Sequence, residues 1–156
     1  MFNAKNFKNG SLSKNIFETN FGKNNTENED TFNWKDMCVL VVEDNYTSFR
    51  LLEITLSRTG IKIIHVENGL TAIDAIKDHP EINLVLMDIQ LPIMDGYEAT
   101  SEIKKIRPEL VIIAQTANAM DDDRQKCFFA GFNDYITKPI ALHTMLSIIN
   151  MYIRKP

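Results

Sequence analysis

Three carboxylates and one lysine follow short apolar runs at separate places in the chain. Glu43 and Asp44 come directly after one run, Asp88 closes a second, and Lys138 follows a third. Two carboxylates about 4 Å apart repel by about 4 kcal/mol at an effective dielectric of about 20, so such a cluster needs a cation. Oxygen ligands without a nearby Cys or His suit a hard ion such as Mg²⁺. We therefore expect a Mg²⁺ site made by these carboxylates.

Phosphoryl transfer is the chemistry that such a site would perform. Once a cation screens the negative charge, one carboxylate can attack phosphorus and form an aspartyl phosphate. Lys138 would neutralise the remaining phosphate charge, and Thr116, which ends another apolar run, offers a hydroxyl donor. Taken alone, an Asp at a strand end is more often a helix N-cap or a turn residue. The joint appearance of these residues is what favours the phosphoryl site.

Short apolar runs rich in β-branched residues alternate with helix-like stretches from Met37 onward. This pattern predicts five βα units, with helices on both faces of one parallel sheet. Parallel strands place their C-terminal ends at one edge, where ligands of open α/β sheets bind. The expected strands cover residues 37–42, 61–66, 83–88, 111–115 and 133–137, and the expected helices cover 46–59, 70–78, 96–106, 119–130 and 141–153.

The first 33 residues differ in composition from the rest. They contain nine asparagines and no sustained apolar period, so they cannot easily bury enough surface to fold alone. We interpret residues 1–35 as an Asn-rich flexible tail or linker and residues 36–156 as one folded domain. Five phenylalanines within the first 33 residues leave open a second interpretation, a docking segment that orders on a partner.

Charge and apolar patterning exclude several classes of protein. Lys and Arg number 17 against 21 Asp and Glu, a net charge of −4, which argues against a broad basic surface for nucleic acid. The sequence as given lacks an apolar stretch long enough for a signal peptide or a membrane span. We therefore expect a cytoplasmic protein without direct membrane contact. Cys38 and Cys127 are interpreted as small buried apolar residues rather than as a disulfide or metal pair.

Four segments resemble the receiver domain of response regulators in two-component signalling. They read VLVVEDN, MDIQLPIMDGYEA, IIAQTANAM and AGFNDYITKPI, and the resemblance spans residues 37–153. The amino-acid sequences of these segments are most similar to those of the receivers of hybrid histidine kinases. The resemblance implies a flavodoxin-like (βα)5 three-layer sandwich with the parallel strand order 2-1-3-4-5.

The resemblance also implies a role for each residue of the site. Asp88 would be the phosphoacceptor and Lys138 a phosphate contact, with Mg²⁺ or Mn²⁺ as the cofactor. The further implied roles are metal ligation by Glu43, Asp44, Asp88 and the backbone carbonyl of Gln90, and conformational switching by Thr116 and Tyr135.

Two backbone features are expected beside the site. Gly96 is expected to take a positive φ in the loop after Asp88, where other residues would be strained. Lys138 and Pro139 resemble the family's cis X-Pro joint, which would aim the lysine into the site, and a trans turn is the alternative.

The function implied by the resemblance is that of a signalling module in a phosphorelay. A partner histidine kinase or histidine phosphotransfer protein would donate a phosphoryl group to Asp88, and the domain would signal by a conformational change. It would catalyse only its own phosphorylation and dephosphorylation. Residues 118–153 correspond to the usual dimer face of the family, so a homodimer through that face is one option. A complete small regulator and a piece of a hybrid kinase both remain open.

Three other interpretations are less favoured. A Mg²⁺-dependent phosphatase with an Asp nucleophile, of the haloacid dehalogenase type, would need a second Asp where Gln90 stands. A flavodoxin-like cofactor binder would need a phosphate-cradling loop where Glu43 and Asp44 would repel an anion. A pseudo-receiver would bind partners without phosphorylation, but every expected site residue is present.

Overall fold

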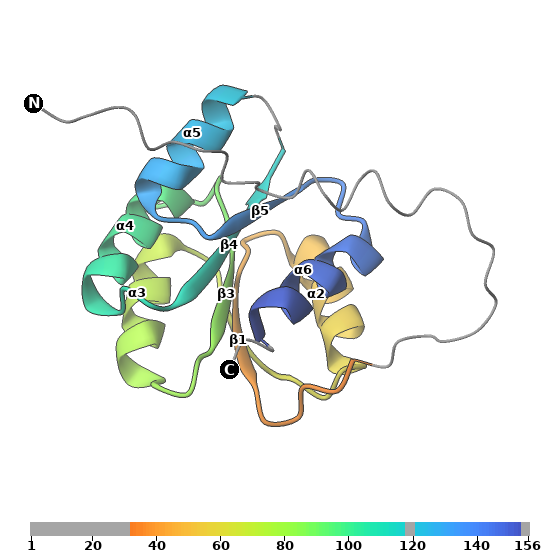
Figure 1. Cartoon of the computed structure of the whole chain (residues 1–156). Helices are drawn as coiled ribbons and strands as arrows, with labels where there is room; N and C mark the ends of the chain where they lie inside the picture. The colour runs from red at the N-terminus through yellow and green to blue at the C-terminus, as the bar shows by residue number, and fades with distance from the viewer. Residues whose placement is uncertain (1–31, 118–120, 154–156) are drawn as a thin grey trace, which may run out of the picture. The chain divides into compact units, whose positions relative to one another are not determined.

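Five strands and five helices alternate along the part of the chain that the computed structural model describes, residues 32–117 and 121–153 (Figure 1). Most of the expected tail lies outside these residues. The strands are β1 Cys38–Val42, β2 Lys62–Val66, β3 Leu84–Asp88, β4 Val111–Thr116 and β5 Asp134–Thr137. The helices are α2 Tyr46–Ser57, α3 Gly69–Asp78, α4 Gly96–Ile106, α5 Asp121–Ala130 and α6 Leu142–Ile153.

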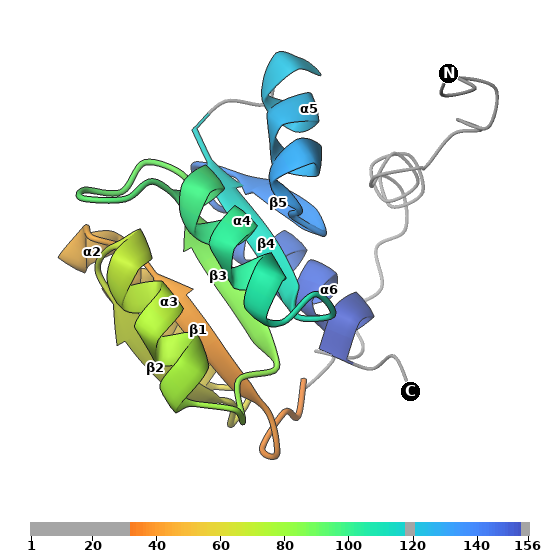
Figure 2. The same ribbon diagram turned by 90° about the vertical axis from the view of Figure 1, so that its left-hand side faces the viewer.

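The five strands form one parallel sheet in the order β2-β1-β3-β4-β5. Helices α2 and α6 cover one face of the sheet, and α3, α4 and α5 cover the other (Figures 1 and 2). The expected flavodoxin-like three-layer sandwich is therefore confirmed. This arrangement places the C-terminal ends of all five strands at one edge, called the carboxyl edge below.

Alternation of side chains along each strand builds two cores. In β1, Val39 and Val41 pack into the core beneath α2 and α6, whereas Leu40 and Val42 pack into the core beneath α3, α4 and α5. All of β1 is buried, as expected for a strand covered on both faces. The apolar run that looked like a buried parallel strand thus holds the start of the site rigidly.

Side-chain caps fix the helices that begin at the carboxyl edge. Asn45, Asn68 and Asp95 each accept a hydrogen bond from a backbone N–H three residues further on, at the start of α2, α3 and α4. Such caps satisfy backbone donors that have no partner within the helix. The loops that follow β1, β2 and β3 therefore end at defined positions beside the site.

The loop between β3 and α4 corrects one expectation. Gly96 does not take a positive φ, and the residue of this loop that does is Ile93, at 70°. Gly96 is needed for a different reason, because a Cβ atom there would collide with the backbone carbonyl of Asp88. The glycine lets the start of α4 approach the end of β3 closely.

The packed structure begins before residue 36. Trp34 is 2% exposed, and its backbone N–H donates to the carbonyl of Thr59 at 2.8 Å. Its ring Nε1 donates to Asn150 Oδ1 in α6 at 3.4 Å, and the ring of Phe32 lies 5.2 Å away between centroids. Trp34, which we expected in the tail, is part of the core because the start of β1 and the end of α6 leave room for its ring.

Two smaller observations concern the cysteines and the membrane. Cys38 and Cys127 are buried in the same core cluster and neither forms a disulfide, as expected. Among the helices of the described residues, none combines the length and the apolarity needed to cross a bilayer.

Candidate phosphoryl and metal site

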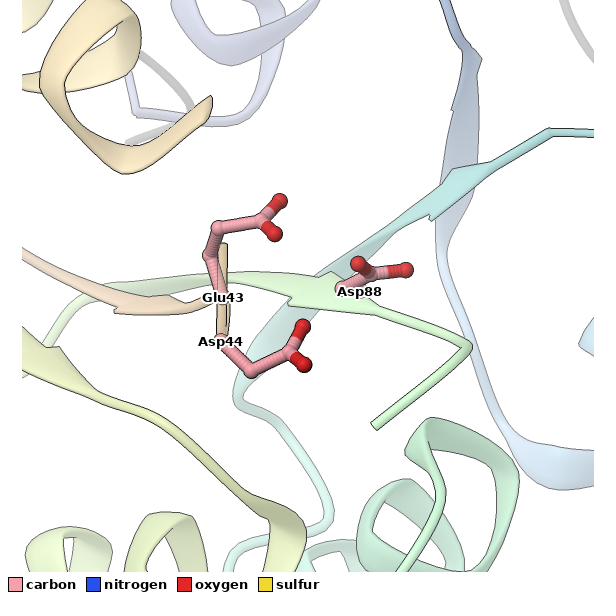
Figure 3. A group of neighbouring side chains, drawn as sticks. All are labelled: Glu43, Asp44 and Asp88. Carbon is pink, nitrogen blue, oxygen red and sulfur yellow. The ribbon is translucent and has the colours of Figure 1, made fainter. Parts of the chain in front are cut away.

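Three carboxylates meet at the carboxyl edge of the sheet. Glu43 and Asp44 follow β1, and Asp88 is the last residue of β3. One carboxylate oxygen of each lies within 4.8 Å of the others. Figure 3 shows Glu43 and Asp44 extending toward the side on which Asp88 lies. These three residues are called the acidic cluster below.

Lys138 joins two members of the acidic cluster. Its Nζ donates to Asp88 Oδ2 at 2.7 Å and to Glu43 Oε2 at 3.0 Å, from a side chain that is 28% exposed. The Lys138–Pro139 peptide bond is cis, as the resemblance implies. The backbone N–H of Lys138 donates to the carbonyl of Thr116 at 2.7 Å, which ties the lysine to the end of β4.

Burial and neighbouring charges raise the pKa values of both Glu43 and Lys138. Burial raises the pKa of Glu43, which is 1% exposed, and the hydrogen bonds from Lys138 and Asn45 only partly oppose this. Burial alone would lower the pKa of Lys138, but the hydrogen bonds and charges of Asp88 and Glu43 outweigh it, so its pKa is raised. One ammonium group therefore serves two carboxylates of a cluster that holds three.

Backbone hydrogen bonds orient the carboxylates. Asp88 Oδ1 accepts from the backbone N–H of Gln90 at 3.0 Å, and Glu43 Oε1 accepts from that of Asn45 at 3.1 Å. The imidazole of His65 donates through Nε2 to the carbonyl of Glu43 at 2.8 Å. The first two contacts fix the directions of the Asp88 and Glu43 carboxylates before any ligand arrives.

His65 supports the site from the neighbouring strand. Its ring stacks on Phe49 of α2, 3.6 Å between centroids. Its hydrogen bond to Glu43 holds the loop that carries the acidic pair. Sequence alone could not reveal this, because the contact joins β2 to the end of β1.

The two expected switch residues lie near the same edge. Thr116 ends β4 and is buried, and Tyr135 lies in β5 with its ring half-buried. The guanidinium carbon of Arg124 lies 5.4 Å from the centre of the Tyr135 ring, a cation–π contact between α5 and β5. This contact joins the middle of the sheet's edge strand β5 to α5. Asn118, beside Thr116 in sequence, lies outside the described residues.

Gln115 is a further polar residue of this edge that sequence reasoning missed. It pairs in register with Asp88 and is fully buried. Its position inside an apolar strand offered only one signal, a long polar side chain where the pattern calls for an apolar one. An interior polar residue next to a charged site needs an explanation.

The donor set of the acidic cluster suits a hard divalent cation. Three carboxylates offer oxygen ligands within 4.8 Å of one another, and the two positive charges of one divalent cation would balance the negative charge that the ammonium of Lys138 leaves. The exposed position of Asp44 leaves an approach from solvent, whereas Glu43 and Asp88 are buried. The residues therefore fit Mg²⁺ better than a transition metal that prefers sulfur or imidazole.

Comparison with known proteins places the chain in a signalling context. The family model of the response regulator receiver domain matches residues 39–150. The sensor histidine kinase GacS of Pseudomonas protegens is 35% identical over 129 residues, a match that covers 80% of this chain and 14% of GacS. The chain thus spans a small part of the curated relatives that it matches.

Solved structures show the same fold. The receiver domain of the sensor histidine kinase PA1611 from Pseudomonas aeruginosa, with a magnesium ion in its active-site cleft, is 35% identical with a TM-score of 0.71, and the match covers 76% of this chain and 98% of that one. A chain in the co-crystal structure of Saccharomyces cerevisiae Ypd1, a histidine phosphotransfer protein, with the receiver domain of Ssk1 is 30% identical with a TM-score of 0.71, covering 75% of this chain and 88% of that one.

Proposed function

Because the chain belongs to the response regulator receiver domain family, we propose that it accepts a phosphoryl group on Asp88. The observation that carries this proposal is the acidic cluster, with Asp88 held by Lys138 and by the backbone of Gln90. An oxygen of Asp88 forms a bond to phosphorus while the N–P bond of a donor phosphohistidine breaks, and the electron pair stays on the histidine nitrogen. The domain would itself catalyse this transfer to Asp88 and the later hydrolysis of the aspartyl phosphate.

Mg²⁺, or Mn²⁺ in its place, would be held by the acidic cluster and the backbone carbonyl of Gln90. When bound, the ion supplies positive charge that screens the carboxylates from the incoming phosphoryl oxygens. Lys138 then exchanges carboxylate partners for a phosphoryl oxygen, because the transferred group carries about two negative charges. The magnesium-containing receiver domain of PA1611 supports this assignment.

Thr116 and Tyr135 would transmit the change. The Thr116 hydroxyl moves toward the phosphoryl group, and the Tyr135 ring turns inward and alters its contact with Arg124. The output is then a change in the surface around α5 and β5.

The donor would be a histidine kinase or a histidine phosphotransfer protein, since GacS is a histidine kinase and Ypd1 is a histidine phosphotransfer protein. We propose that the transfer takes place in the cytoplasm. The proposed function requires no direct contact with nucleic acid or membrane.

The described part of residues 118–153 presents an exposed apolar pair on α5. Phe128 and Phe129 are 60% and 84% exposed, and this pair supports a homodimer through that face.

Intact mass after incubation with acetyl phosphate and Mg²⁺ tests the proposal. The wild type should gain one phosphate, and Asp88→Asn should gain none. Asp74→Asn, which removes an exposed carboxylate of α3, serves as the matched control and should gain one phosphate. A chelator should abolish the adduct. An equal adduct on Asp88→Asn would contradict the assignment of the acceptor.

Partner affinity provides a second test of signalling. Binding of a histidine phosphotransfer protein or of a second copy should differ between the free domain and the domain loaded with beryllium trifluoride, a phosphoryl mimic. Equal affinities in both states would defeat the switch, because a ligand with equal affinity for two states shifts nothing.

A further inference from the structure

Gln115 is a buried amide with unused hydrogen-bonding groups. The residue is 0% exposed, and within the described part of the chain neither its Nε2 nor its Oε1 has a hydrogen-bond partner. A buried polar group without a partner is rare, and it destabilises the state in which it occurs. The side chain therefore favours any other state in which a partner becomes available.

The register of the sheet places Gln115 beside the phosphoacceptor. Asp88 of β3 and Ile136 of β5 are its partners on the two neighbouring strands. Side chains paired across parallel strands point to the same face, and Ile136 belongs to the core beneath α2 and α6. Gln115 thus lies between Asp88 and that apolar core, on the face opposite to the one that the neighbouring Thr116 uses.

The oxygens of Asp88 are occupied in the present state. Oδ1 accepts from the backbone N–H of Gln90, and Oδ2 accepts from Lys138, which also holds Glu43. A phosphoryl group on Asp88 brings new negative charge that draws the ammonium of Lys138 to itself. An oxygen of the Asp88 side chain then loses its charged donor. Gln115, its partner on the neighbouring strand, carries an amide N–H with no partner among the described residues.

Resting on the proposed function, we propose that Gln115 is a positioning residue whose Nε2 donates to the Asp88 side chain only when a phosphoryl group occupies the site. The amide without a partner disfavours the empty state, and its new hydrogen bond favours the loaded one. Gln115 therefore raises the affinity for a phosphoryl mimic without touching the donor protein. A purely structural Gln115 would change the stability of the fold and leave that affinity alone.

Gln115→Met separates these two roles. Met has a similar unbranched length but lacks the amide donor and acceptor, so it should pack in the same space. In the presence of Mg²⁺, the variant should bind beryllium trifluoride about five- to tenfold more weakly than the wild type, which corresponds to one net hydrogen bond. The melting temperature of the empty variant should equal or exceed that of the wild type, because a buried amide without a partner has been removed.

Thr100→Val is the matched control. Thr100 lies in α4, is fully buried, and its Oγ1 likewise has no partner among the described residues. Its removal should change the stability of the empty domain without changing the affinity for beryllium trifluoride. Unchanged affinity in Gln115→Met, with wild-type binding intact, would overturn the inference and leave the proposed function standing.

An NMR measurement on the wild type makes the test independent of how the variant folds. The side-chain amide signals of Gln115, identified by their loss in Gln115→Met or Gln115→Leu, should shift downfield when beryllium trifluoride binds. Signals that stay in place on loading would overturn the inference. A wild type that neither binds the mimic nor takes phosphate on Asp88 would overturn the proposed function as well.

Discussion

The two edges of the sheet differ in how their polar side chains are paired. The amino edge is the edge at which the five strands begin. There, Asn133 Oδ1 accepts hydrogen bonds from the backbone N–H of Ile112 at 2.9 Å and from Lys104 Nζ at 3.0 Å. Asn83 Oδ1, just before β3, accepts from the backbone N–H of Cys38 at 2.8 Å. Neutral amide side chains thus close the starts of β1, β4 and β5.

The carboxyl edge brings like charges together instead. Glu43, Asp44 and Asp88 lie together, and the ammonium of Lys138 bridges only Glu43 and Asp88. The amide of Gln115 is without a hydrogen-bond partner within the described part of the chain. Repulsion and unused hydrogen-bonding groups disfavour the empty state of such a site.

This difference separates stability from function within one sheet. Polar groups that are fully paired stabilise the fold and have nothing left to offer a ligand. Groups that are crowded or without a partner cost stability, which a cation and a phosphoryl group can restore. The amino edge should therefore respond to mutation with lost stability, and the carboxyl edge with altered ligand dependence.

Trp34→Ala should cause the largest loss at the amino edge. Deleting a buried aromatic side chain costs about 3–5 kcal/mol of unfolding free energy. Urea unfolding would measure it, with Phe129→Ala as the control, because Phe129 is 84% exposed. A loss below that of the control would mean that the domain does not need residues before 36.

Asn133→Ala should follow, with a loss of about 2–3 kcal/mol, since two donors lose their shared acceptor and one of them is a backbone N–H. The same unfolding assay applies, with Asn33→Ala at an exposed position as the control. Mg²⁺ should not restore the stability. Restoration by Mg²⁺ would break the proposed separation between the two edges.

Lys138→Met should cost about 1–2 kcal/mol without a metal, because Glu43 and Asp88 lose their common donor. Mg²⁺ competes with the ammonium for the same oxygens, so it should raise the melting temperature of the variant more than that of the wild type. Lys62→Met removes an exposed ion pair and should leave the stability nearly unchanged. Equal Mg²⁺ responses in the wild type and Lys138→Met would contradict competition for these carboxylates.

Tyr152→Phe should give the smallest effect, measured as a change in how the unfolding free energy depends on alkaline pH. Burial, together with the charge and hydrogen bond of Asp134, raises the pKa of Tyr152 from 10.0 to about 12. The folded state therefore holds this proton more tightly, so its stabilising contribution is present below pH 10 and is lost as the pH rises through about 12.

In that window the unfolding free energy of the wild type should fall more steeply with pH than that of Tyr152→Phe. Thermal unfolding at a series of pH values measures both slopes. Parallel slopes would show that the contact between Tyr152 and Asp134 does not contribute to the unfolding free energy.

Sequence predicted the elements of this fold to within about two residues in the described part of the chain, for example 70–78 against Gly69–Asp78 for α3. It succeeded because fully buried strands are continuous apolar runs, and their periodicity differs from that of the amphipathic helices between them. The joint placement of Glu43, Asp44, Asp88 and Lys138 followed from the rule that parallel strands end at one edge.

Other features depend on contacts between distant segments and were not visible in the sequence. Gly96 is required by the approach of α4 to the carbonyl of Asp88, and the positive φ of this loop belongs to Ile93. Trp34 is in the core because α6, more than a hundred residues later, supplies Asn150 and apolar neighbours.

The sequence by itself determined the element order, the residue types of the site and the edge at which they gather, because local propensity and alternation specify these. Only the tertiary structure decided that Lys138 bridges Glu43 and Asp88, that His65 holds the acidic loop, and that Gln115 is buried with no hydrogen-bond partner among the described residues. Distances and burial result from the packing of all layers at once, and no local window of sequence contains that information.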